Sequence, residues 1–121
     1  MLGEGTFVSL LLFLHAHAPD PVTRQIAMLA ARDEARHVAF GMTHLMARLD
    51  NEPDFRTRLA HAVQSRNDAL SATSGLNEEV FDALILLAAG ESTPTAIATG
   101  YLRVQQLMRD MAEGRQARLE K

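Results

Sequence analysis

The chain divides into five apolar-rich segments separated by short stretches that are rich in proline, glycine, aspartate and serine. Leu, Ala and Met are plentiful in these segments and runs of β-branched residues are few, which favours helices over strands. We therefore expect an all-α fold with short loops, in which sequential helices are antiparallel neighbours. The expected helices cover about residues 3–18, 21–49, 53–74, 78–89 and 94 to the charged tail.

The residues at the expected helix ends fit the chemistry of helix capping. N-caps are favoured where a short polar side chain can accept a hydrogen bond from the first turn; the candidates are Asp20, Asn77 and either Ser92 or Thr93. Pro21 and Pro94 suit the first helical position, because a proline there loses no intrahelical hydrogen bond. Gly75 and Gly90 are expected to end the third and fourth helices.

Composition narrows the classes of function. At 121 residues, 47% of them hydrophobic, the chain can form one domain or part of one. It contains no cysteine, and its net charge of −3 comes without a basic stripe, so we expect a cytoplasmic protein that binds no nucleic acid. The apolar run "FVSLLLFL" is too short to span a membrane, and Glu4 rather than a basic residue precedes it, so we expect no membrane association.

The stretch "AARDEARHVAFG" contains a Glu-x-x-His pair, Glu34 and His37. On a helix these side chains differ by about 60° in direction and about 4.5 Å in height, so both can reach one metal ion. Both lie toward the apolar side of the predicted helix, which also carries Ile26. A buried carboxylate is costly unless it is paired or bound to a metal. The alternative is a Glu–His pair in a satisfied polar network of the core.

Glu4 lies at a matching height in the preceding helix. It is 14 residues before the expected helix end at Ala18, and Glu34 is 14 residues after the cap Asp20. In an antiparallel hairpin both therefore lie about 21 Å from the turn. One Glu and one Glu-x-x-His at the same level form half of the dinuclear carboxylate site that four-helix bundles build.

With Glu4 and "DEARH", residues 3–49 resemble the ferritin-like superfamily of di-iron and di-manganese carboxylate proteins. The resemblance implies Glu4 as a terminal ligand, Glu34 as a bridge between two metals and His37 as a terminal nitrogen ligand. It further implies two iron ions, with manganese as the alternative, and a dioxygen-activating oxidase or oxygenase that acts on a small molecule. The alternatives are a ferroxidase or iron-storage protein, and a metal-free helical interaction module.

The family pattern needs a second Glu and a second Glu-x-x-His, and residues 50–121 contain no such motif. We therefore expect residues 1–50 to form a ferritin-like hairpin with half of a site, and residues 51–121 to add about three helices to the same core. A missing N-terminal half or a second copy of the chain would complete the site. In either case the first two helices should present a broad apolar surface.

Overall fold

The computed structural model describes the backbone over residues 2–72 and 77–119, and the side chains over residues 5–69 and 77–117. Within these ranges the chain forms five α-helices and no strand, which confirms the all-α expectation. The helices are α1 (Leu2–His17), α2 (Pro21–Asn51), α3 (Phe55–Ala72), α4 (Glu78–Ala89) and α5 (Pro94–Leu119).

The helix ends form as the capping residues predict. The Asp20 carboxylate accepts a hydrogen bond from the Thr23 N–H at 2.8 Å, and the Asn77 side chain accepts one from the Val80 N–H at 2.9 Å. Of the two candidates before α5, Thr93 accepts from the Ala96 N–H at 3.2 Å. Gly90 ends α4 with a φ of 77°, a left-handed conformation that glycine adopts without strain. The expected helix end at Gly75 lies outside the described residues.

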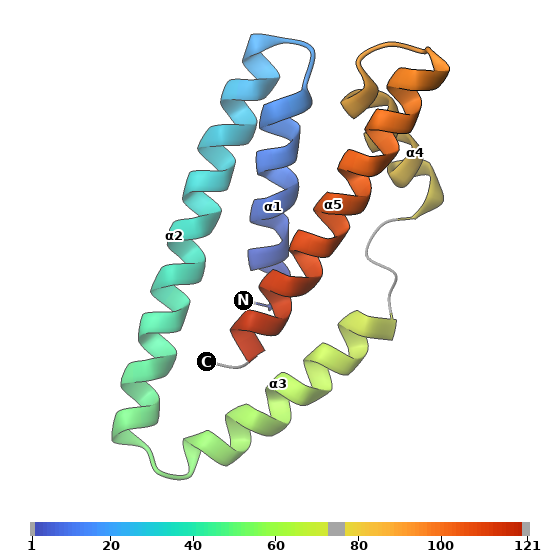
Figure 1. The fold of residues 1–121 in the computed structure, drawn as a ribbon. Coiled ribbons are helices and arrows are strands. Elements are labelled where there is room, and N and C mark those ends of the chain that lie inside the picture. The colour runs from blue at the N-terminus through green and yellow to red at the C-terminus, as the bar shows by residue number, and fades with distance from the viewer. Residues whose placement is uncertain (1, 73–76, 120–121) are drawn as a thin grey trace.

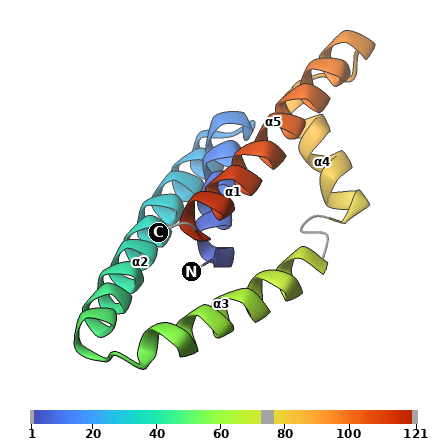
Figure 2. The ribbon, with the colours of Figure 1, turned by 60° about the horizontal axis from the view of Figure 1, so that its bottom comes forward.

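α1 lies between α2 and α5 and runs antiparallel to both, while α4 packs on α5 (Figures 1 and 2). α3 departs from the expectation that sequential helices pack as antiparallel neighbours. It meets α2 near the connecting loop and then runs away from it (Figure 1). The physical reason is the composition of α3, which has a polar surface and few apolar side chains to bury.

The core forms where α1, α4 and α5 meet. Phe13 of α1 packs against a cluster of buried side chains from the other two helices: Leu84, Ala88, Val104, Leu107 and Met111. α2 packs on the other side of α1, and its buried residues are the small Ala27 and Ala31. Small side chains at this contact let the two helix backbones approach closely.

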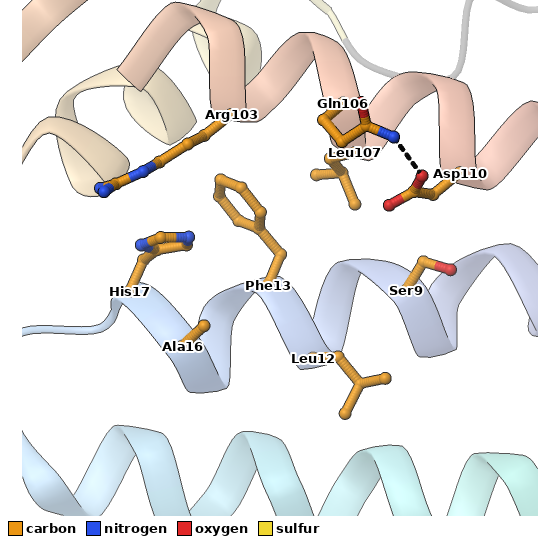
Figure 3. A pocket seen from close by; sticks show the side chains of 9 residues that line it. All are labelled: Ser9, Leu12, Phe13, Ala16, His17, Arg103, Gln106, Leu107 and Asp110. Atoms are coloured by element: carbon orange, nitrogen blue, oxygen red, sulfur yellow. Dashed lines mark hydrogen bonds between the residues drawn. The ribbon is translucent and has the colours of Figure 1, made fainter. Parts of the chain in front are cut away.

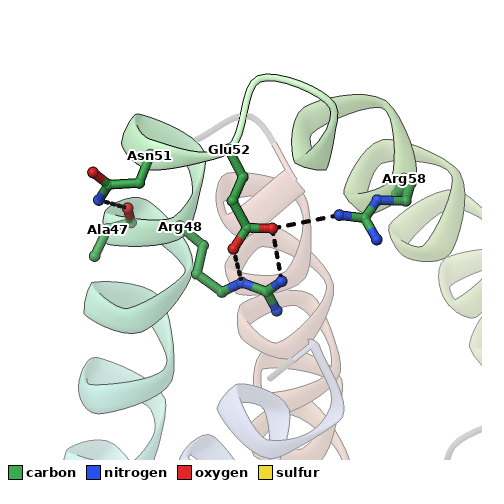
Figure 4. Close-up of polar contacts among 5 residues, drawn as sticks. All are labelled: Ala47, Arg48, Asn51, Glu52 and Arg58. Atoms are coloured by element: carbon green, nitrogen blue, oxygen red, sulfur yellow. Dashed lines mark hydrogen bonds and ion pairs between the residues drawn. The ribbon is translucent and has the colours of Figure 1, made fainter.

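An ionic corner fixes the start of α3 (Figure 4). The Glu52 carboxylate accepts two hydrogen bonds from Arg48, at 2.8 and 2.9 Å, and a longer one from Arg58 at 3.4 Å. The hydrogen bonds from Arg48 lower the pKa of the Glu52 carboxyl below its usual value, and the charges of Arg48 and Arg58 lower it further. The Arg48 guanidinium also lies 4.1 Å from the centre of the Phe55 ring. The group is solvent-exposed, so it orients the chain more than it stabilises the fold.

Among the described residues, no single helix is both long and apolar enough to cross a membrane. One pair of helices, α4 with α5, passes the same test of length and composition together, and this pair is bent by 119° at the break between them.

Gly100 permits the close packing of α5 on α4, and replacing it with alanine tests that contact. An added Cβ would meet the carbonyl oxygen of Ile85 and lie 3.0 Å from the Ala89 nitrogen. Alanine favours helix over glycine by about 1 kcal/mol, but overpacking against a backbone costs about 1–3 kcal/mol. We expect Gly100→Ala to lower the midpoint of thermal unfolding. Thr99→Ala, at an exposed position of the same helix, is the control; a Gly100→Ala midpoint at or above that of the wild type would contradict the contact.

Candidate metal half-site on the α1–α2 hairpin

The hairpin places Glu4 and Glu34 at one level along its axis. α1 ends at His17 and α2 begins at Pro21, so each glutamate is 13 residues, or about 20 Å, from its end of the turn. In Figure 1 the N-terminal end of α1 accordingly lies beside the middle of α2. Glu4 belongs to α1, but its side chain lies outside the described side chains. Its convergence with Glu34 therefore stays a prediction.

Glu34 and His37 contact each other as their spacing predicts. Oε2 of Glu34 lies 3.5 Å from Nδ1 of His37. The Glu34 side chain is 27% exposed and that of His37 is 74% exposed. The distance is long for a hydrogen bond, and an exposed pair of this kind contributes little to stability. The pair is therefore available to a ligand rather than closed on itself.

The burial of this pair differs from the expectation of an apolar, buried face. The apolar side of α2 exists, but its large side chains, among them Ile26 and Phe40, are exposed in the single chain. His37 is exposed with them, because no other described helix covers this side of α2. Large apolar side chains are accessible on both helices, since α1 also exposes Phe7 and Leu12.

No further ligand joins the pair from the part of the chain whose side chains are described: there, no three His, Asp or Glu side chains come together as a potential metal site. Asp33 forms an ion pair with Arg36 at 3.0 Å on the surface of α2. His44 stacks on Phe40, with ring centres 6.5 Å apart. A metal site that includes Glu34 and His37 would therefore need ligands from outside the described side chains.

The histidines near the turn have contacts of their own. Nδ1 of His15 donates to the carbonyl oxygen of Arg24 at 2.9 Å, and Nε of Arg24 donates to the carbonyl oxygen of Ala18 at 2.6 Å. These bonds tie the end of α1 to the start of α2. The role of His15 is therefore structural.

A shallow groove of about 400 Å³ between α1 and α5 is a feature that the sequence did not predict (Figure 3). His17 and Phe13 line it from α1, and Arg103 and Asp110 line it from α5. Its charged groups have partners: Arg103 donates to the carbonyl oxygen of Ala88 at 2.7 Å, and Asp110 accepts from Gln106 at 2.7 Å. The helices that form it are about 90 residues apart in sequence, and no local motif marks it. The groove offers no nucleophile and base in contact.

Comparison of the chain with known protein families, with curated proteins and with solved structures finds no match.

The pH dependence of stability tests the position of His17. Burial lowers the pKa of the His17 imidazole below its ordinary value of 6.5, and the charges of Arg103 and Arg24 lower it further. Well above pH 6.5 the ring is neutral in both states; as the pH falls through 6.5 toward the folded-state pKa, the unfolded chain takes up a proton first and stability falls. We expect the thermal midpoint of wild type to drop over this interval more than that of His17→Gln. Equal drops in the two proteins would contradict the burial of this ring.

Proposed function

We propose that the α1–α2 hairpin is half of a ferritin-like carboxylate metal site, in which Glu34 and His37 bind one ion together with Glu4. The observation that carries the proposal is the contact between Glu34 and His37. The Glu34 side chain is half-buried on α2. The antiparallel neighbour α1 carries a second glutamate, Glu4, at the same height. A carboxylate in such a position is most favourable when a cation neutralises it.

The two described donors fit a metal ion in both distance and chemistry. Oε2 of Glu34 and Nδ1 of His37 are 3.5 Å apart. If an ion lies about 2.1 Å from each of these atoms, the angle between the two bonds at the ion is about 110°. This angle suits tetrahedral and distorted octahedral sites. A carboxylate combined with an imidazole suits iron, with manganese as the alternative.

A second half must supply the remaining ligands, and we propose that it comes from a second copy of the chain or from a further part of the same protein. Two copies about a two-fold axis would contribute six ligands: two each of Glu4, Glu34 and His37. The four carboxylates would balance the charge of two divalent ions. Ala30 and Gly41 lie one turn before and two turns after Glu34 on the same side of α2, and their small size leaves space there.

The activity that we propose for the completed site is oxidation or oxygenation of a small molecule with dioxygen. A pair of bound iron ions would supply the dioxygen-activating chemistry. The chain's own contribution would be to hold the ions through Glu34 and His37 at fixed positions on a rigid helix. A ferroxidase that stores iron is the alternative within the same chemistry. The lack of cysteine is compatible with a reducing compartment, and we propose the cytoplasm.

The second candidate function is a metal-free helical interaction module. The exposure of His37 and of the apolar side chains on α2 favours it, because an interaction surface needs accessible apolar area and no ligand geometry. The two candidates differ in whether metal changes the properties of the protein.

Metal affinity tests the proposal through the two described ligands. We expect the full chain to bind Fe(II) under anaerobic conditions, and Mn(II) as a stable substitute, in calorimetric titrations. Glu34→Gln and His37→Ala should each weaken binding at least about tenfold, which is about 1.4 kcal/mol. Asp33→Asn is the matched control, because this exposed carboxylate lies on the same helix and pairs with Arg36 instead. Equal affinities in all four proteins would show that other residues bind the ion.

Thermal stability separates the two candidate functions. An ion that binds the folded chain raises the unfolding midpoint in proportion to the logarithm of its concentration. We expect such a rise with Mn(II) in the wild type and a much smaller one in Glu34→Gln. No shift in the wild type at millimolar Mn(II) would contradict the metal site and leave the interaction module as the better account.

A further inference from the structure

The exposed apolar side of α2, which carries Ile26 and Phe40, faces away from α1. We call it the outward stripe; it consists of Val22, Ile26, Leu29, Asp33, Arg36 and Phe40, spaced alternately four and three residues apart. Its apolar members are 66%, 61%, 47% and 76% exposed. The spacing is that of the a and d positions of a coiled coil, whose side chains form one continuous seam along a helix.

The outward stripe adjoins the candidate metal half-site and does not include Glu34. Glu34 directly follows Asp33, so its side chain leaves the helix axis about 100° away from that of Asp33, whereas His37 directly follows Arg36 and lies along the Ile26 edge of the stripe. Ala27 and Ala31, which are buried on α2, lie on roughly the opposite side of the helix from the stripe. In Figures 1 and 2 the edge of α2 that faces away from α1 is covered by no other helix that the structure describes.

We infer that the outward stripe is a homodimer interface, in which the α2 helices of two copies of the chain pack antiparallel. The charges at the centre of the stripe carry this assignment. Asp33 and Arg36 are both exposed at about two-thirds of their side-chain area and lie in the middle of the stripe. An antiparallel pair centred between them places Asp33 of each copy beside Arg36 of the other. A parallel pair would place Asp33 beside Asp33 and Arg36 beside Arg36, which repel.

The same register matches the apolar side chains. It places Phe40 of one copy against Leu29 of the other, so that these two exposed apolar side chains cover each other. Farther out, Ile26 meets Thr43, whose hydroxyl already donates to the carbonyl oxygen of Ala39 at 3.0 Å. Burial of Thr43 therefore leaves its donor satisfied. One register thus satisfies both the charges and the apolar positions.

The two kinds of contact have different roles in this interface. Burying Phe40 and Leu29 removes apolar area from water and supplies affinity. Moving Asp33 and Arg36 out of water costs nearly as much as their attraction returns, so the ion pairs set orientation and register. Losing an apolar contact should therefore dissociate the dimer. The effect of inverting one charge should be reversed when the other charge of the pair is inverted as well.

The mass of the full chain in solution tests the interface. With EDTA present, so that the result is independent of any metal, we expect sedimentation equilibrium to give twice the monomer mass of 13.3 kDa at micromolar concentration. Phe40→Ser should raise the dimer dissociation constant at least tenfold. Leu102→Ser, which removes a 62% exposed side chain from α5, is the matched control and should leave the constant unchanged. A wild-type chain that is monomeric up to 1 mM would overturn the inference, because its free energy of association would then be about 4 kcal/mol at most.

Charge inversion tests the pairing of Asp33 with Arg36. Asp33→Arg and Arg36→Asp should each weaken the dimer, because each places like charges at the centre of the seam. The double variant D33R/R36D should restore the wild-type dissociation constant. Circular dichroism checks that helix content is equal in all three proteins. A double variant as weak as the single ones would overturn the antiparallel register.

Cross-linking tests the orientation, and the absence of native cysteine makes it unambiguous. Leu29→Cys and Phe40→Cys are prepared as separate proteins and oxidised alone and as a mixture. The antiparallel register predicts a disulfide-linked dimer in the mixture only, because each position lies about 16 Å from its own copy along the seam. Cross-linking of Leu29→Cys alone would indicate a parallel pair and overturn the inference, and so would the absence of cross-linking in the mixture.

Discussion

The fold depends on the need to cover α1, which is apolar on every side. Phe13 fills the contact with α4 and α5, where Val104 is completely buried, and the small Ala27 and Ala31 bring α2 against the opposite side. This arrangement fixes α2 as the outer helix of the molecule, with only one side used for packing. The exposed sides of α2 are therefore a consequence of how the chain buries α1. Both the proposed metal half-site and the proposed dimer interface use these exposed sides.

The local parts of the structure follow from the sequence, and the non-local parts do not. Asp20, Asn77 and Gly90 act within one turn of their own positions, so their capping chemistry predicts the helix ends. The contact of Glu34 with His37 is predictable for the same reason, because the two residues are three positions apart on one helix. The direction of α3 and the groove between α1 and α5 depend on residues far apart in the chain, for which the sequence contains no local signal.

The exposure of His37 shows the limit of reasoning from a helical wheel. The wheel correctly groups His37 with apolar residues, but it does not state whether another helix covers that group. In the described chain none does, because α4 and α5 cover α1 instead. An apolar side of a helix therefore indicates a contact surface, while the identity of the partner depends on the rest of the fold and on the assembly.

Binding of one metal ion by Glu34 and His37 can be followed through the NMR signals of the five histidines during a titration with paramagnetic Mn(II). We expect the ring signals of His37 to broaden first and at substoichiometric Mn(II), while those of His15, bonded to Arg24 at the turn, persist. The same titration of Glu34→Gln should leave the His37 signals sharp. Equal broadening of all five histidines, or loss of the His37 signals in the variant as in the wild type, would contradict binding by Glu34 and His37.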